Sequence, residues 1–201
     1  YKQRLTFHPG QYNVLGTSDP VKLKNTVSDL DYHAEVLDRI GCGSDSVIVI
    51  HVGGVYGNKT ETIKRWIDNY SKLPERVKRR LVIENCEKSY SIVDCLNISK
   101  KTDIPVVFDN HHFECYNQYK SHTDINQLPN QIIPEVIKTW INRNIKPKFH
   151  ISEQGDGQIG KHSDYINSIP NYYLEIPFKY QIDIDIMVEA KMKEQAINEL
   201  H

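Results

Sequence analysis

Short apolar runs recur along the chain, and a histidine or an acidic residue follows each of them. The runs occupy residues 5–7, 47–50, 81–83, 106–108, 147–149 and 182–188. The residues that follow them are His8, His51, Glu84, Asp109, His150 and Glu189. Runs of this length, rich in β-branched residues and bounded by polar ones, are typical of buried strands. The sequence therefore predicts strands whose carboxyl ends each carry a metal-capable side chain.

Longer polar segments with helical periodicity separate these runs. In residues 27–40 the apolar side chains fall at three- to four-residue spacing, and Gly41 ends the pattern. Similar patterns predict helices at residues 60–73, 89–100, 128–141 and 190–201. Ser89 is the expected N-cap of the helix at 89–100. Strands that alternate with helices in this way form βαβ units and a parallel sheet.

Two parallel architectures fit this alternation. A doubly wound sheet concentrates its chemistry at one switch point, commonly beside a glycine-rich phosphate turn, and no G-x-G-x-x-G occurs here. In a (β/α)8 TIM barrel every strand ends on the same face, so many strands can contribute to one site. The barrel therefore fits the recurring strand ends better. Because a full barrel has about 250 residues, we expect a single domain, residues 1–201, that lacks the first two βα units.

The strand ends and their flanking loops supply a mixed set of imidazoles and carboxylates. The candidate ligands are His8, His51, Glu84, Asp109, His112, His150, His162 and Glu189. Each alone has a plain structural explanation, since a lone histidine after a strand is usually a turn residue. Mixed histidine and carboxylate ligands suit Zn, Mn or Fe rather than Ca. More ligands than one ion needs predict two or three ions, an arrangement that clamps the reacting oxygens of a phosphodiester.

Two local patterns refine this ligand set. Asp109 and His112 form an Asp-x-x-His pair in which both side chains can reach one ion, while His111 is expected to point away. Period-two alternation places Lys148 on the same side of its strand as His150. A buried lysine is costly unless it is paired, deprotonated or modified. From the residues alone, we expect Lys148 to pair with a carboxylate.

The loops after the strands carry side chains suited to nucleic acid. Gln11 and Tyr12 lie directly after the candidate ligand His8, where an amide can bond a base edge and an aromatic ring can stack on it. The formal net charge is −1, which argues against a general polyanion-binding surface. A local basic rim is expected instead, formed by Lys2, Arg4, Lys59 and Lys161.

The remaining composition indicates an intracellular protein. The four cysteines, Cys42, Cys86, Cys95 and Cys115, form no C-x-x-C pair and are expected to be buried free thiols. No apolar run approaches the length of a membrane span, so no membrane partner is expected.

Blocks along the whole chain closely resemble the UV damage endonuclease family, which is related to endonuclease IV. They are H-P-G-Q-Y (8–12), I-H-V-G-G (50–54), I-E-N (83–85), F-D-N-H-H (108–112), K-F-H-I-S (148–152), K-H-S-D-Y-I (161–166) and V-E-A-K (188–191). The resemblance implies a TIM barrel that holds a divalent metal cluster, usually Mn²⁺, with Zn²⁺, Co²⁺ and Mg²⁺ as alternatives. It also implies a DNA repair endonuclease that nicks double-stranded DNA 5′ of cyclobutane pyrimidine dimers and 6-4 photoproducts, with no obligate protein partner.

The resemblance also assigns roles to residues of this sequence. The metal ligands it implies are His8, His51, Glu84, Asp109, His112, His150, His162 and Glu189. Glu84 and Glu189 would bridge ions, and Gln11 and Tyr12 would probe the lesion. Lys148 matches a lysine that is carboxylated in the family, which replaces the pairing expected from the residues alone. Glu84, Glu189 and Lys148 are thus the catalytic candidates.

Three other interpretations remain open at this stage. An endonuclease IV-type apurinic endonuclease shares several motifs, but it carries an Asp two residues before the histidine that matches His162, and Gly160 stands there in this chain. A metal-dependent sugar isomerase or epimerase barrel would use a similar ligand cage and would have no need for Gln11 and Tyr12. A remnant that binds metal or DNA without catalysis is the non-enzymatic alternative.

Overall fold

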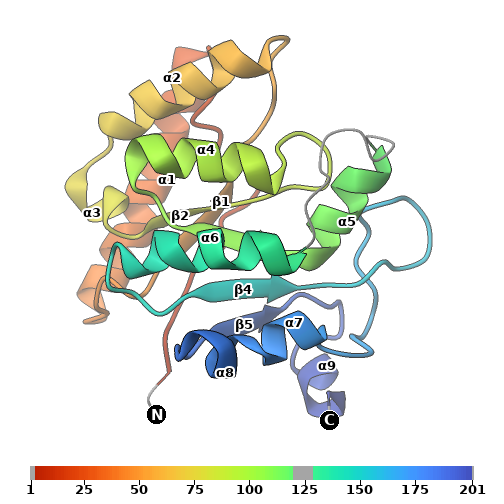
Figure 1. Ribbon diagram of the computed structural model, residues 1–201. Coiled ribbons are helices and arrows are strands. Elements are labelled where there is room, and N and C mark those ends of the chain that lie inside the picture. The colour runs from red at the N-terminus through yellow and green to blue at the C-terminus, as the bar shows by residue number, and fades with distance from the viewer. Residues whose placement is uncertain (1–2, 120–128, 201) are drawn as a thin grey trace.

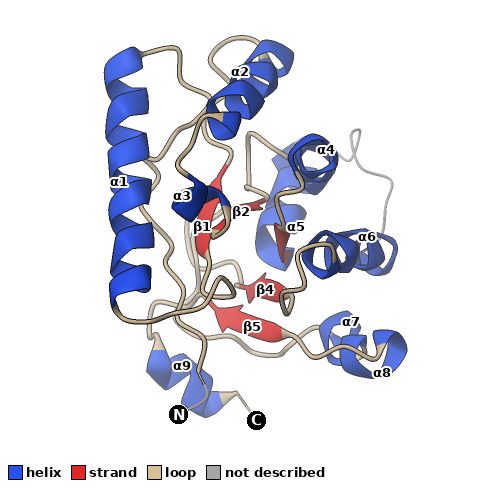
Figure 2. Ribbon diagram, turned by 90° about the vertical axis from the view of Figure 1, so that its left-hand side faces the viewer, coloured by secondary structure: helices blue, strands red, loops and turns tan. Residues whose placement is uncertain are grey.

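The computed structural model describes residues 3–119 and 129–200, and its centre is a five-stranded parallel sheet that curls into a half-barrel (Figure 2). The strands are β1 (Ile48–His51), β2 (Leu81–Glu84), β3 (Val106–Asp109), β4 (Lys148–Ile151) and β5 (Asp185–Val188). They lie side by side in their order along the chain. This order is that of a barrel-like sheet, because a doubly wound sheet reverses direction at a switch point.

Two of the predicted strands differ from the structure. The predicted strand at residues 5–7 is wrong, because Phe7 alone pairs with the sheet, through a parallel bridge to Ile48. The N–H of Phe7 donates to Val47 O at 3.0 Å, and the N–H of Val49 donates to Phe7 O at 2.8 Å. The last strand begins at Asp185 rather than at Ile182. Phe7 still places His8 beside the end of β1.

Helices lie on the outside of the sheet (Figure 1). They are α1 (Pro20–Arg39), α2 (Lys59–Ser71), α3 (Glu75–Lys78), α4 (Ile92–Thr102), α5 (Asn110–Tyr119), α6 (Pro129–Ile141), α7 (Asn171–Leu174), α8 (Ile176–Tyr180) and α9 (Glu194–Glu199). The helices predicted at 60–73 and 128–141 correspond to α2 and α6, although residue 128 lies outside the described chain. The helix predicted at 190–201 is confined to α9, and α5 was not predicted.

Capping side chains explain where two helices begin. The carboxylate of Asp19 accepts hydrogen bonds from the N–H groups of Val21 and Lys22, and Pro20 occupies the first helical position, so α1 begins earlier than residue 27. The prediction that Ser89 caps α4 is wrong. Ser91 is the N-cap and forms a reciprocal capping box with Asp94.

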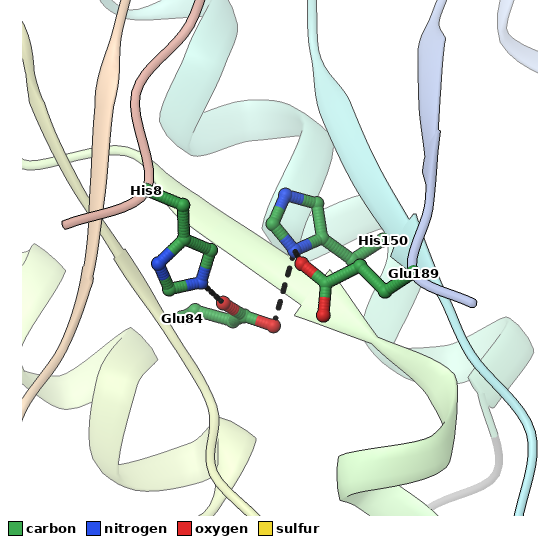
Figure 3. Close-up of side chains that lie close together, drawn as sticks. All are labelled: His8, Glu84, His150 and Glu189. Atoms are coloured by element: carbon green, nitrogen blue, oxygen red, sulfur yellow. Dashed lines mark hydrogen bonds and ion pairs between the residues drawn. The ribbon is translucent and has the colours of Figure 1, made fainter. Parts of the chain in front are cut away.

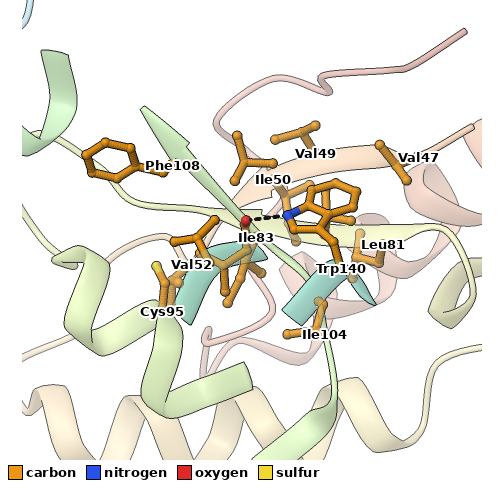
Figure 4. Close-up of a cluster of buried hydrophobic side chains, with 14 of the residues drawn as sticks. Val47, Val49, Ile50, Val52, Leu81, Ile83, Cys95, Ile104, Phe108 and Trp140 are labelled. Carbon is orange, nitrogen blue, oxygen red and sulfur yellow. Dashed lines mark hydrogen bonds between the residues drawn. The ribbon is translucent and has the colours of Figure 1, made fainter. Parts of the chain in front are cut away.

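The apolar core fills the space between the sheet and the helices (Figure 4). Every residue of β2, β3 and β4 is buried, as expected for strands covered on both faces. Trp140 of α6 is fully buried, and its indole N–H donates to Val106 O at 2.7 Å. This bond ties α6 to the start of β3 and satisfies the buried indole.

Two further findings bear on the expectations drawn from composition. All four cysteines are free thiols, as predicted; Cys42 is half-buried, and the other three are buried. Within residues 3–119 and 129–200, no helix is both long and apolar enough to cross a membrane.

Candidate metal centre

The parallel strands bring the predicted side chains to one end of the sheet. His51, Glu84 and Asp109 are the last residues of β1, β2 and β3. His150 is the third residue of β4, and Glu189 directly follows β5. Because carboxyl ends of parallel strands meet at one edge, residues far apart in the sequence become neighbours here.

Glu84 lies at the centre of this end, with its side chain fully buried. Its Oε2 lies 2.9 Å from Nε2 of His8 and 3.8 Å from Nε2 of His51. Its Oε1 lies 3.2 Å from Nδ1 of His112 and 3.2 Å from Nδ1 of His150. The two oxygens of one carboxylate therefore face imidazoles from four segments of the chain.

Six of the predicted ligands form two groups that share Glu84. The first group is His8, Glu84, His150 and Glu189 (Figure 3), and the second group is His51, Glu84 and His112. Within each group, one ligand atom from every residue lies within 4.8 Å of the others. In the first group, Oε1 of Glu189 also lies 2.9 Å from Nδ1 of His150. Each group thus converges imidazole and carboxylate atoms on a small volume.

Asp109 and His162 lie beside these two groups and not within them. Oδ1 of Asp109 accepts a hydrogen bond from the backbone N–H of His112 at 2.7 Å, so Asp109 holds the first turn of α5. Its Oδ2 accepts a bond of 3.3 Å from the hydroxyl of Ser152. Nδ1 of His162 lies 4.0 Å from Oε2 of Glu189. Metal ligation by Asp109 and His162 stays a prediction.

His111 has a different environment from its neighbour His112. It is buried in α5, and both of its ring nitrogens lie 3.5 Å from Sγ of Cys115, one helical turn further on. It belongs to neither group of ligands in the described chain. This contact is consistent with the prediction that His111 is a bystander.

Burial and opposite charges set the protonation of the shared carboxylate and its neighbours. Burial alone would raise the pKa of Glu84, but the positive charge of His150 and the hydrogen bonds from His112 and His150 hold it well below its usual value. Burial alone would lower the pKa of His150, but Glu84 and Glu189 raise it to about 10. For His51 burial dominates and lowers the pKa. Glu84 is therefore ionised at neutral pH, and the imidazole of His51 is neutral.

The buried imidazoles also provide a test of whether a metal fits here. Nδ1 of His51 and Nε2 of His150 are buried and have no hydrogen-bond partner in the described residues, while the other ring nitrogen of each histidine is the one that faces Glu84. A buried polar atom left without a partner is costly, and such atoms are rare in folded proteins. The donor set of histidine nitrogens and carboxylate oxygens is one that divalent transition metals prefer. The side chains present therefore fit a divalent metal cluster.

Lys148 is buried at the start of β4, with 4% of its surface exposed. Burial, together with the positive charge of Arg4, lowers its pKa to about 8. The pairing first expected from the residues alone is not found, because no described carboxylate lies within ion-pair distance of Lys148. Asp185, which faces it across the sheet, pairs with Arg4 and Lys146 instead.

A cavity of about 500 Å³ lies beside the two groups. His8 and His51 line it together with Gln11, Gly53 and Glu87. Gly53 has a positive φ of 101°, and the position that a Cβ would occupy lies 3.2 Å from the Val14 side chain. The backbone beside His51 is therefore shaped by a glycine at the edge of the cavity.

The expected basic rim is only partly present. Arg4 lies at the opposite end of the strands, where it pairs with Asp185 at 2.7 Å. Lys59 pairs with Asp94 at 2.5 Å and lies over the rings of Tyr90 and Tyr116. Lys161 is exposed beside His162, as expected. Lys2 lies outside the described residues.

Two buried residues that support the site were not predicted from the sequence. The hydroxyl of Tyr173 lies 3.2 Å from Phe108 O and 3.1 Å from His150 O, so it spans β3 and β4. The side-chain amide of Asn85 bonds to the backbone of Asp109. The one sequence signal that could have identified Asn85 is its position directly after Glu84. No sequence signal could have identified Tyr173, because its hydroxyl bonds to backbone carbonyls.

Known proteins resemble this chain in both sequence and structure. It is 36% identical over 200 residues to a UV DNA damage endonuclease of Bacillus cereus (strain B4264), covering 98% of this chain and 61% of that protein. It is 37% identical over 201 residues to the UV DNA damage endonuclease of Bacillus velezensis, covering 98% and 60% of the two chains. The chain thus spans about three-fifths of the length of these relatives.

Two solved structures share the architecture of this chain. The crystal structure of SacUVDE matches with a TM-score of 0.79 and 37% identity, covering 96% of this chain and 62% of that one. A D-psicose 3-epimerase from Clostridium cellulolyticum matches with a TM-score of 0.59 and 13% identity, covering 93% and 63%, which shows a shared fold alone. The family model described as UV-endonuclease UvdE matches residues 1–201. The chain therefore belongs to the UvdE family of UV endonucleases.

Proposed function

We propose that the protein that carries this chain is a metal-dependent DNA repair endonuclease, which nicks the phosphodiester 5′ of UV photoproducts. The observation that carries the proposal is the pair of ligand groups that share Glu84 at one end of the sheet, in a chain whose relatives are named UV DNA damage endonucleases. Cyclobutane pyrimidine dimers and 6-4 photoproducts in double-stranded DNA are the proposed substrates. We also propose an intracellular location and no obligate protein partner.

The two groups supply ligands for a cluster of two or three divalent ions, with Mn²⁺ proposed and Zn²⁺, Co²⁺ or Mg²⁺ as alternatives. The first and second groups would each hold an ion, and Asp109 and His162, which lie beside these groups, are the further ligands that we propose. Such ions, when bound, stabilise the negative charge that develops on a phosphate during in-line displacement. Glu84 lies between the two groups, and Glu189 faces both His150 and His162, so these two carboxylates are the proposed bridging ligands.

Gln11 and Tyr12 are the proposed lesion-probing residues. Both are exposed, and 84% of the surface of Tyr12 is accessible to solvent. An aromatic ring exposed so close to His8 can stack on a base that a photoproduct has displaced. Gln11 lines the cavity beside His8, where its amide can meet a base edge.

Lys148 is proposed to be carboxylated on its amine. Its burial, its pKa of about 8 and the lack of a described carboxylate partner raise the fraction of the amine that is neutral, which is the form that reacts with carbon dioxide. The nitrogen–carbon bond forms with release of a proton, and the product is an anion near the ligand groups. NMR of protein prepared with ¹³C-labelled bicarbonate tests this, and a Lys148→Arg variant should lose the carbamate signal.

The test of the proposed function is a nicking assay on the intact protein. A duplex that carries a single cyclobutane dimer should be cut 5′ of the lesion in the presence of Mn²⁺. Glu84→Gln should slow this cleavage by about a thousandfold, since the loss of metal stabilisation is worth several kcal/mol. Glu61→Gln, which makes the same change on the exposed face of α2, should cut like the wild type.

Two further substrates, each tested with the same protein, decide between the alternatives. Faster cutting of an abasic-site duplex would favour an apurinic endonuclease, and turnover of free ketose sugars without DNA binding would favour an epimerase. The sequence argues against the first alternative, because Gly160 stands where that family carries an aspartate. Equal cleavage by wild type and Glu84→Gln would refute the assignment of the metal centre.

A further inference from the structure

Asn85 directly follows the shared ligand Glu84, and its side chain is fully buried. Its Nδ2 donates to Asp109 O at 3.0 Å, and its Oδ1 accepts from the N–H of Asp109 at 2.9 Å. The amide therefore pairs with both backbone groups of a residue on the next strand. A side chain that satisfies a buried backbone N–H and C=O together fixes the position of that residue in two directions.

This pairing continues the sheet beyond the point where its backbone ladder ends. The register of β2 and β3 runs as far as Glu84 opposite Val107. Asn85 then pairs with Asp109, which is the last residue of β3, and α5 begins at the next residue. The side chain of Asn85 thus sets where the first turn of α5 starts relative to the end of β2.

The first turn of α5 carries His112, which belongs to the second group. Nδ1 of His112 lies 3.1 Å from the backbone oxygen of Asn85, and its backbone N–H donates to Oδ1 of Asp109 at 2.7 Å. Asn85 and Asp109, which the side-chain amide of Asn85 holds together, therefore both support His112. Nδ1 of His112 lies 3.2 Å from Oε1 of Glu84, so the same contacts set the distance between two ligands.

We propose that Asn85 is a positioning residue, which holds His112 against Glu84 and so builds the second group. The role rests on the metal-dependent function proposed above. The first group does not use α5, because its members come from the segment after Phe7 and from β2, β4 and the end of β5. Loss of the Asn85 amide should therefore weaken one group of ligands and spare the other.

A purely structural role would predict a different result, and Thr139 provides the comparison. Thr139 Oγ1 accepts from the N–H of Val106 at 3.0 Å, so it also satisfies a backbone group of β3, at the opposite end of that strand. Thr139 contacts no candidate ligand in the described chain. Thr139→Val should therefore lower stability without changing metal binding.

The experiment is a titration of the intact protein with Co²⁺, whose visible absorption reports the ligands around each ion. Asn85→Asp is the first variant, because it keeps the shape of the side chain and replaces only the Nδ2 donor with an oxygen that repels Asp109 O. Its added negative charge would strengthen cation binding, so a weaker affinity must come from geometry. Asn85→Ala, which removes both bonds, is the second variant, and thermal unfolding of each variant confirms that it is folded.

We expect two classes of Co²⁺ binding in the wild type. In both Asn85 variants, the affinity of one class should fall by about 10–100-fold, which is the loss typical of removing a residue that supports a metal ligand. The absorption bands of the other class should be unchanged, and Thr139→Val should titrate like the wild type. Unchanged binding in the Asn85 variants would overturn the inference and leave the proposed function standing. So would an equal loss in Thr139→Val. A wild type that binds no ion would overturn the proposed function and this inference together.

Discussion

Glu84 on β2 reaches His150 on β4 across the intervening strand, with 3.2 Å between Oε1 and Nδ1. In a flat sheet, side chains two strands apart are separated by roughly 10 Å. The contact therefore requires the curvature of the half-barrel, which turns the ends of β2 and β4 toward each other. Curvature thus makes one buried carboxylate available to both groups of ligands.

Because Glu84 belongs to both groups, each single substitution should lower metal binding by one group or by both. His150→Ala should lower the bound Mn²⁺ through the first group, and His112→Ala should lower it through the second. Glu84→Gln should lower both. Metal content after gel filtration, measured by mass spectrometry, checks this order. Retention of the full metal content by Glu84→Gln would contradict a shared ligand.

Removal of metal should make the protein less stable to heat. An ion that binds only the folded state stabilises it by about 2.7 kcal/mol at a concentration one hundred times its Kd. For a chain of this size, that corresponds to a rise in Tm of roughly 5–10 °C. Thermal unfolding with Mn²⁺ and after dialysis against EDTA measures the difference. Glu84→Gln is the control, since its Tm should respond little to Mn²⁺.

Neutralising Lys59 should lower stability, whereas neutralising Lys161 should weaken DNA binding. Lys59 pairs with Asp94 and lies 5.3 Å from the centre of the Tyr90 ring, so Lys59→Gln should cost about 1–2 kcal/mol of stability. Lys161 is exposed, so Lys161→Gln should leave stability unchanged and reduce the salt dependence of DNA affinity by about one phosphate contact. Urea unfolding and fluorescence anisotropy at several salt concentrations distinguish the two. A reversed pattern would place Lys59, and not Lys161, on the DNA.

Acid should weaken the contact between α1 and the start of β2. The guanidinium of Arg80 is buried and holds the pKa of Asp38 below its usual value. A lowered pKa in the folded state contributes stability that is complete above the unfolded value of about 3.9 and is lost as the pH falls through the folded value. Asp38→Asn should therefore cost about 2 kcal/mol at pH 7, as expected for hydrogen bonds to a charged group. The difference from wild type should narrow below about pH 4, which calorimetry across that range would show.

The loop that carries His162 should tolerate no side chain at Gly155. A Cβ there would lie 2.8 Å from the carbonyl carbon of His162 and 3.0 Å from Cα of Ser163, and both are backbone atoms. Gly155→Ala should therefore cost about 1–3 kcal/mol and displace His162. Gly10→Ala is the matched control, because a Cβ at Gly10 meets nothing within 4 Å. Comparison of the two Tm values checks the prediction, and equal values would contradict it.

The sequence predicts the strands well where burial leaves no choice of residue. Residues 106–108 form an uninterrupted apolar run because β3 is covered on both faces, and the polar residue that follows marks its end. The single pairing of Phe7 was not predictable, because residues 5–7 have the same composition as a full strand. The helix α5 was missed because its polar first turn is held by Asp109, which the sequence analysis assigned to metal binding alone.

The candidate site was predictable as a set of residue types and not as a set of contacts. Strand ends placed Glu84 and His150 on one face, because that depends on local pattern alone. The supporting roles of Asn85 and Ser152 depend on the distance to Asp109, which lies 24 residues from one and 43 from the other. Ser91 could have been predicted as the N-cap of α4, because Asp94 three residues later completes a capping box. Ser89 has no such partner three residues later.

The order of the strands also determines when the two groups of candidate ligands can form. Their members are spread from His8 to Glu189, and neighbouring strands pair only after a helix has crossed between them. Such long-range parallel pairing is slow compared with helix formation. Glu189 follows the last strand, so the first group is incomplete until β5 has docked on β4. On the ribosome, the first group would thus stay incomplete until nearly all of this segment had emerged.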